Sequence, residues 1–210
     1  MLDTSLELQY TSLTLGYFLS LLLFVFSVSI TPGPNNLMVT ASGMNFGYQR
    51  TLPHILGICA GCLILMSLTA LGLGSLFVRF PVVHTALKVI GSLYLLWLAY
   101  KIFTASAPGA GKERTRPMSF TQAVLFQFVN PKAWTMGVTG ISAFSLNGEL
   151  LVPSIITVIS VQTLLCLPCC SAWAIMGAKI RSWLASPHKI VWFNRTLGLV
   201  TASSVLMIVN

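Results

Sequence analysis

Long apolar stretches alternate with short polar segments along almost the whole chain. A transmembrane α-helix needs about 20 consecutive apolar residues to cross the hydrocarbon core of a bilayer. Stretches of this kind occupy residues 16–44, 52–78, 82–103, 119–146, 151–178 and 196–209. They predict six transmembrane helices. The sixth stretch is short for a full span unless residues 190–194 extend it, so its start stays open.

Two of the predicted spans contain residues that an α-helix does not accommodate. Pro32-Gly33-Pro34 lies near the middle of the first span, and Asn130-Pro131-Lys132 lies near the middle of the fourth. Proline removes a backbone donor and clashes with the carbonyl one turn back. In hydrocarbon the freed polar groups must be satisfied by protein or by water. The sequence therefore predicts two broken helices. For the first break, a loop just past the end of a span is the simpler alternative.

The two breaks occupy corresponding places in the two halves of the chain. Residues 1–104 hold three predicted spans, 105–118 form a linker rich in Pro, Gly and basic residues, and 119–210 hold three more spans. Because three is odd, the halves must have opposite orientations in the membrane. We therefore expect a single all-α polytopic membrane domain, residues 1–210, built as two inverted three-helix repeats. Broken segments at corresponding positions of such repeats are typical of secondary transporters.

Composition and charge agree with a membrane protein and set its orientation. The chain is 55% hydrophobic and 8% charged, whereas soluble domains carry about 25% charged residues. Basic residues follow spans one, three and five, so the positive-inside rule places loops 1–2, 3–4 and 5–6 in the cytoplasm and both termini in the periplasm. The net charge of +8 is thus a topology signal, and we expect no nucleic-acid partner. The basic segment 179–195 carries Trp183 and Trp192, which predicts a helix lying partly at the interface.

Polar side chains at the two breaks form the predicted substrate site. Lys132 is the one charge expected at mid-membrane, where an ammonium costs at least about 2.5 kcal/mol. It must face the bundle interior, unless it snorkels to a membrane surface. The predicted site consists of Pro32, Gly33, Pro34, Asn35, Asn36, Gln127, Asn130, Pro131 and Lys132. Half-helix N-termini suit a carboxylate and amide oxygens suit an ammonium, so a small zwitterionic amino acid fits this set.

The roles of three amides in this site stay open at the sequence level. Gln127 either presents its amide to the site or joins two helices. Asn35 and Asn36 either contact the substrate or only satisfy the broken backbone.

The glycine pair Gly57-x-x-x-Gly61 lies in the second predicted span. This spacing puts two bare backbone patches on one helix face and permits close helix approach. Such a face serves a homodimer or a contact within one chain equally well.

Five cysteines supply the main alternative function. Cys59-x-x-Cys62 and Cys166-x-x-Cys169-Cys170 would suit a membrane thiol-redox or metal-handling protein. On apolar spans, however, cysteine usually serves as a small hydrophobe. The histidines have no carboxylate beside them in sequence, and no Ser-His-Asp arrangement or catalytic carboxylate pair is readable. We therefore expect no metal, no cofactor and no enzymatic activity.

The motifs together resemble the LysE/RhtB family of amino-acid exporters from about residue 15 to the C-terminus. The residues that carry the resemblance are Thr31-Pro32-Gly33-Pro34-Asn35-Asn36, Gly57-x-x-x-Gly61, Gly91-x-x-Tyr94-Leu95-x-Trp97-Leu98-Ala99 and Gln127-Phe128-x-Asn130-Pro131-Lys132. The resemblance implies secondary-active efflux of small amino acids or their derivatives across the bacterial inner (plasma) membrane. The implied partners are a small amino-acid-like substrate, the lipid bilayer and an ion gradient, with protons as the expected ion. Gln127-Phe128-Val129-Asn130, followed by Gly137-Val138-Thr139, is similar to the cysteine/O-acetylserine exporter branch.

The predicted spans lack the titratable carboxylate that proton antiport normally uses. No Asp or Glu falls inside any of them. Either Lys132 carries the proton, the substrate carries it, or coupling is looser than the family implies. The exact substrate, the coupling ion and the oligomeric state are open at this level.

Overall fold

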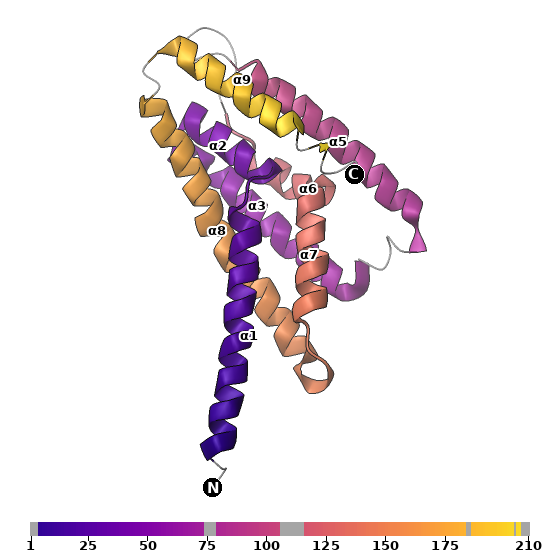
Figure 1. The fold of residues 1–210 in the computed structure, drawn as a ribbon. Helices are drawn as coiled ribbons and strands as arrows, with labels where there is room; N and C mark the ends of the chain where they lie inside the picture. The colour runs from indigo at the N-terminus through magenta and orange to yellow at the C-terminus, as the bar shows by residue number, and fades with distance from the viewer. Residues whose placement is uncertain (1–3, 74–78, 106–115, 184–185, 204, 207–210) are drawn as a thin grey trace.

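The computed structural model describes residues 4–73, 79–105, 116–183, 186–203 and 205–206, and within them the chain is helical with no strand. The α-helices are α1 (Thr4–Ile30), α2 (Pro34–Phe46), α3 (Tyr48–Leu68), α5 (Pro81–Phe103), α6 (Phe120–Val129), α7 (Pro131–Phe144), α8 (Leu151–Trp183) and α9 (Pro187–Ser203) (Figure 1). The short turns η1 (Thr69–Leu73) and η2 (Gly148–Leu150) complete the described elements. The all-α class is therefore confirmed.

The helix is interrupted at both predicted positions. α1 ends at Ile30 and α2 begins at Pro34, with an angle of 56° between them. α6 ends at Val129 and α7 begins at Pro131. Each second half starts with proline because the first helical residue needs no N–H partner and the ring fixes a helical φ.

Several helices are long and apolar enough to cross a membrane. Within the described residues these are Tyr48–Gly72 and Gly148–Arg181, and the bent pair Thr14–Ile30 plus Pro34–Phe46 counts as a third span. Val89–Phe103 and Phe120–Val129 are shorter apolar helices. The chain is therefore a multi-pass membrane protein, and the expected number of six spans stays a prediction.

The start of the sixth helix, which the sequence left open, lies within the basic segment 179–195. α8 continues to Trp183, and α9 begins at Pro187, well before the predicted start of the sixth stretch at Thr196. Asn194 is fully buried in α9 while Arg195 is exposed. The first half of α9 carries polar and basic residues, His188, Lys189, Asn194 and Arg195, and a search for continuous apolar residues therefore detects only its last part. Most of the predicted linker, residues 106–115, and residues 207–210 lie outside the described part of the chain.

Glycines let α2 and α8 cross in backbone contact. A Cβ atom on Gly43 would overlap the carbonyl oxygen of Ala174, and one on Gly177 would overlap that of Thr40. This crossing is one of the most extensive helix interfaces in the molecule.

Gly57 and Gly61 bring α3 equally close to α6. A Cβ atom on Gly57 would overlap the carbonyl oxygen of Phe120, and one on Gly61 would lie 2.9 Å from that of Val124. The structure thus uses this glycine face for a contact within the chain.

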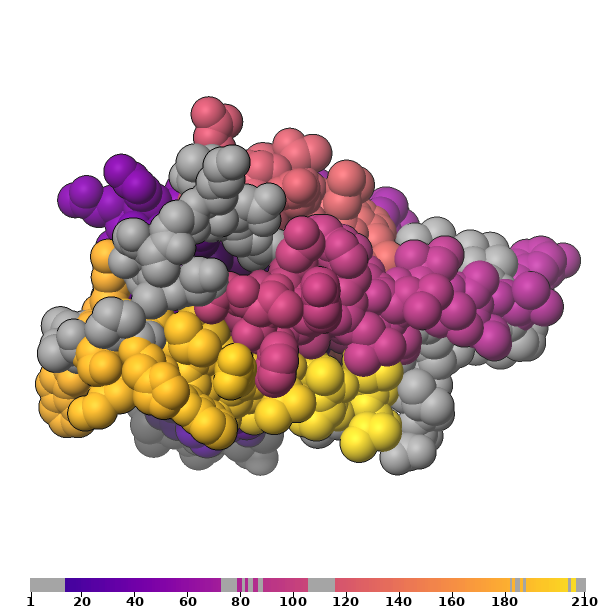
Figure 2. Space-filling model, turned by 90° about the horizontal axis from the view of Figure 1, so that it is seen from above, coloured from indigo at the N-terminus to yellow at the C-terminus, as the bar shows by residue number. Residues whose placement is uncertain are grey.

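α5 and α9 form a separate helix pair that covers one side of the molecule. They lie side by side across the face shown in Figure 2. Gly198 of α9 packs against Phe103 of α5. Their exposed apolar side chains include Leu93 and Leu199, as expected of helices that face lipid. The two breaks therefore lie among α1, α2, α3, α6, α7 and α8.

Candidate functional site

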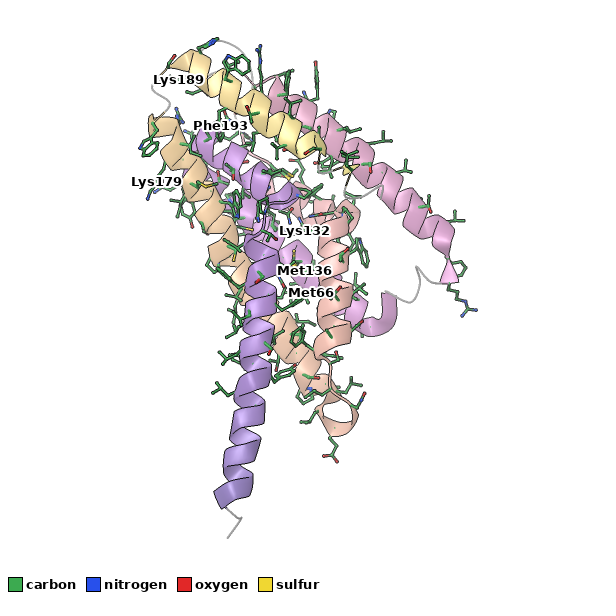
Figure 3. All side chains as sticks on the ribbon, viewed as in Figure 1. Met66, Lys132, Met136, Lys179, Lys189 and Phe193 are labelled. Carbon is green, nitrogen blue, oxygen red and sulfur yellow. The ribbon has the colours of Figure 1, made fainter. Side chains whose placement is uncertain are left out.

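Lys132 connects the two helix breaks directly. Its Nζ donates to the carbonyl oxygen of Thr31 at 2.8 Å, to Thr31 Oγ1 at 2.9 Å and to the carbonyl oxygen of Pro32 at 3.3 Å. An ammonium has three donors, so all of them are directed at the end of α1. A helix C-terminus carries unpaired carbonyls and a partial negative charge. Figure 3 places Lys132 where α1 ends and α2 begins.

Gly33 leaves the space that the Lys132 side chain needs. A Cβ atom on Gly33 would lie 2.8 Å from Cδ and 3.0 Å from Nζ of Lys132. The backbone of Gly33 is extended, with φ −179°, a conformation open to any residue. A side chain at residue 33 would therefore act sterically, by shifting the end of the Lys132 side chain.

Asn35 and Gln127 join the two breaks a second time. Asn35 Nδ2 donates to Gln127 Oε1 at 2.8 Å, and Gln127 Nε2 donates back to Asn35 Oδ1 at 3.1 Å. Gln127 Nε2 also donates to the carbonyl oxygen of Ala123 at 3.0 Å, and the Gln127 side chain is fully buried. In this structure the Gln127 amide therefore links α6 to α2.

Asn36 and Asn130 satisfy the broken backbone. Asn36 Nδ2 donates to the carbonyl oxygens of Ser29 at 2.9 Å and of Thr31 at 2.8 Å. Asn130 Oδ1 accepts from the backbone N–H of Lys132 at 3.2 Å and so caps α7. Both side chains are almost completely buried, as expected for amides that replace missing helical hydrogen bonds.

α8 contributes contacts that the sequence analysis missed. Trp173 Nε1 donates to the carbonyl oxygen of Ile30 at 3.0 Å, and Gln162 Nε2 donates to Ser29 Oγ at 3.2 Å. Gln162, Cys166 and Cys170 follow one another at intervals of four residues. This spacing places them on one helix face and is a signal that could have identified the face.

A small cavity lies between the breaks and α8. Its volume is about 40 Å³, enough for a few water molecules at ~10–15 Å³ each. It is lined by Val28, Ser29, Gly33, Asn35, Asn36, Ile58, Cys62, Asn130, Lys132, Ala133, Met136, Gln162, Cys166 and Cys170. Five of the nine predicted site residues thus line it. Pro32, Pro34, Gln127 and Pro131 belong to the breaks but are not among the lining residues.

The five cysteines are buried and free, and four of them lie together. Cys59, Cys62, Cys166 and Cys170 belong to one buried cluster, and the Cys166–Cys170 sulfur distance is 3.9 Å. Cys169 does not line the cavity. Within the part of the chain that the structure describes, no group of three or more His, Cys, Asp or Glu side chains is arranged to hold a metal ion.

The chain is similar to known proteins over most of its length. Residues 26–206 match the sequence model of the family described as "LysE type translocator". Proteins named cysteine/O-acetylserine efflux protein are 36% identical over 118 residues in Salmonella paratyphi A and 37% identical over 118 residues in Escherichia coli O157:H7. Each alignment covers 56% of this chain and 60% of the relative. The chain thus matches less than two thirds of these relatives' length, and no solved structure matches it.

Proposed function

Because the chain belongs to the LysE-type translocator family, we propose that it exports small amino acids or their derivatives across the bacterial inner membrane. The names of its relatives favour cysteine and O-acetylserine as substrates. We propose that the proton gradient drives this export. The observation that carries the proposal is the meeting of both helix breaks at one cavity, with the Lys132 ammonium between them.

The proposed binding mode starts from Lys132. A substrate carboxylate would compete with Thr31 and Pro32 for the donors of its ammonium, and an ionised acceptor makes the stronger hydrogen bond. Oxygens at Ser29, Asn35 or Asn130 would receive the substrate ammonium. Substrate binding would thereby loosen the connection between α7 and the end of α1.

An inverted repeat would relate α1 to α6, α2 to α7, α3 to α8 and α5 to α9. Two packing relations support it. α5 packs against α9, its own counterpart. α1 and α2 pack on α8, as α6 and α7 pack on α3. This exchange of partners is what a pseudo-two-fold axis in the membrane plane produces.

The helix halves on the two sides of the breaks are packed unequally. On one side, backbone contacts at glycines join α2 to α8 and α6 to α3. On the other side, the interfaces of α1 with α8 and of α7 with α3 are smaller. A Cβ atom on Gly137 of α7 would meet only side-chain atoms, the nearest 3.1 Å away. In Figure 1, α1 extends away from the other helices toward its N-terminus.

The proposed topology assigns the tightly packed side and the looser side to opposite faces of the membrane. The tightly packed side holds the start of α3 and the end of α8, with exposed Arg50, Lys179 and Arg181, and the positive-inside rule assigns it to the cytoplasm. We therefore propose a form that is closed toward the cytoplasm and looser toward the periplasm. Both termini would be periplasmic.

A homodimer, if the protein forms one, would have to use a surface other than the glycine face of α3. Gly57 and Gly61 are covered by α6 of the same chain. The exposed apolar faces of α5 and α9 are available for lipid or for a second copy.

Export can be tested in everted membrane vesicles with a panel of labelled amino acids. The wild-type protein is expected to accumulate cysteine or O-acetylserine in the vesicles, and an uncoupler is expected to abolish the accumulation. Lys132→Ala should remove transport because the carboxylate loses its cationic partner, while membrane expression persists. Lys189→Ala changes an exposed lysine of α9 and serves as the matched control. Full transport by Lys132→Ala would contradict the proposed site.

A further inference from the structure

The central cavity is lined by two chemically different groups of side chains. Lys132, Asn35 and Asn130 supply charge and amides from the two breaks. The sulfur atoms of Cys62, Cys166, Cys170 and Met136 supply a second surface, which we term the sulfur face. Its cysteines come from α3 and α8, the two unbroken helices that pack against the breaks.

The thiols of the sulfur face make only long hydrogen bonds. Cys62 Sγ donates to Gln127 Oε1 at 3.6 Å, and Cys170 Sγ donates to Asn36 Oδ1 at 4.0 Å. Thiols are weak donors and weak acceptors. The sulfur face therefore offers polarizable contact surface but little hydrogen bonding to a molecule in the cavity.

We propose that the sulfur face is the side-chain pocket of the transport site, and that it selects amino acids whose side chains carry no hydroxyl group. The inference rests on the proposed function. With the substrate carboxylate held by Lys132 and its ammonium by oxygens at the breaks, the apolar lining left for a side chain is the sulfur face together with Ile58, Val28 and Ala133. Asn36 and Gln162 also line the cavity, but their amide N–H groups already donate to α1, to the carbonyl of Ser29 and to Ser29 Oγ.

The physical basis of the selection is the desolvation of the substrate side chain. A buried hydroxyl that finds no strong hydrogen-bond partner is penalised, whereas a thiol loses little on leaving water. The sulfur face therefore disfavours serine relative to cysteine. An ester has acceptor oxygens but no donor, and it can accept the weak hydrogen bonds of the thiols. Cysteine and O-acetylserine, the two compounds in the relatives' names, both lack a side-chain hydroxyl.

The test compares cysteine and serine transport in everted vesicles under a reductant. In wild-type protein the initial rate for cysteine should exceed that for serine. The triple variant Cys62→Ser, Cys166→Ser, Cys170→Ser supplies strong hydrogen-bond partners at the same positions. Its cysteine-to-serine rate ratio should fall by about tenfold, the scale set by an unpaired buried hydroxyl. Cys169→Ser is the matched control, because Cys169 is equally buried but does not line the cavity, and it should keep the wild-type ratio.

The outcomes separate this inference from the proposed function. If wild-type vesicles transport none of the panel, the proposed function fails. If they transport cysteine but the triple variant keeps the wild-type ratio, only the role of the sulfur face is overturned. Should the triple variant not reach the membrane, Cys166→Ser alone decides, since the thiol of Cys166 pairs with the thiol of Cys170, whereas Cys62 and Cys170 donate to amides of the breaks. An unchanged ratio in that variant would overturn the proposal, and a lowered ratio would support it.

Discussion

Lys132 and Gly33 are the residues whose contacts decide how the two helix breaks meet. Sequence alone predicted a charge at mid-membrane that faces the bundle interior unless it snorkels to a surface, and it named no partner for that charge. The structure selects the carbonyl end of α1, through Thr31 and Pro32. The sequence does not reveal this pairing because it joins residues 101 positions apart, and no local pattern encodes that contact.

Gly33→Ala should reduce export by roughly tenfold or more. The added Cβ atom would lie 2.8 Å from Lys132 Cδ and would displace the ammonium from Thr31, and hydrogen bonds to a charged group are worth about 1.5–3 kcal/mol each. Initial transport rates in everted vesicles measure the effect at matched expression. Gly16→Ala is the control, because a Cβ atom there meets nothing within 4 Å. Equal rates for the two variants would show that the Lys132 position does not depend on Gly33.

The Asn35–Gln127 pair should contribute to stability as a unit. Gln127→Leu or Asn35→Leu alone leaves one amide at the breaks without its partner, which costs about 1–3 kcal/mol. The double variant removes both partners and should lose less stability than the sum of the single changes. Denaturant unfolding of the purified protein in detergent measures the three variants. Additive losses would mean that the two amides act independently.

At the scale of helices, the proline positions were predictable and the helix crossings were only partly so. Pro34 and Pro131 locate both breaks because the ring forbids an interior helical position. The start of α9 at Pro187 was not found, since its basic residues hide the helix from a search for apolar runs. The site contribution of α8 was missed for a related reason. Gln162 and Trp173 lie in a strongly apolar stretch, and only the folded structure shows which face meets α1.

The crossing of α2 and α8 should be intolerant of any larger residue. Gly43→Val would force a side chain into the backbone of Ala174, and overpacking of this kind typically costs about 1–3 kcal/mol. We expect a lowered melting temperature in detergent and loss of export, because the cytoplasmic side cannot close. Gly140→Ala is the control, since a Cβ atom there would be in ordinary contact, 3.5 Å from Phe24. A wild-type melting temperature for Gly43→Val would contradict the backbone contact.

At the scale of the whole molecule, the unequal packing on the two sides of the breaks bears on alternating access. α2 and α6 are held against the unbroken helices by backbone contacts at Gly43, Gly57 and Gly177. The helix halves on the looser side are α1 and α7, and their interfaces with α8 and α3 are smaller. The cavity of about 40 Å³ has room for only a few water molecules at ~10–15 Å³ each. An exporter takes its substrate from the cytoplasm, so the proposed cycle also needs a form in which α2 and α6 open the cytoplasmic side. Opening of the looser, periplasmic side would then release the substrate.

The proposed direction of opening predicts from which side of the membrane a water-soluble reagent reaches the cavity. Met136→Cys, in a variant whose five native cysteines are alanine, places one thiol on the cavity wall. A membrane-impermeant maleimide should label it faster in right-side-out vesicles than in everted ones, because α7 belongs to the looser side. Asn147→Cys and Arg50→Cys, both at exposed positions, calibrate labelling from the periplasm and the cytoplasm. Faster labelling of Met136→Cys in everted vesicles would reverse the assignment and indicate a form open toward the cytoplasm.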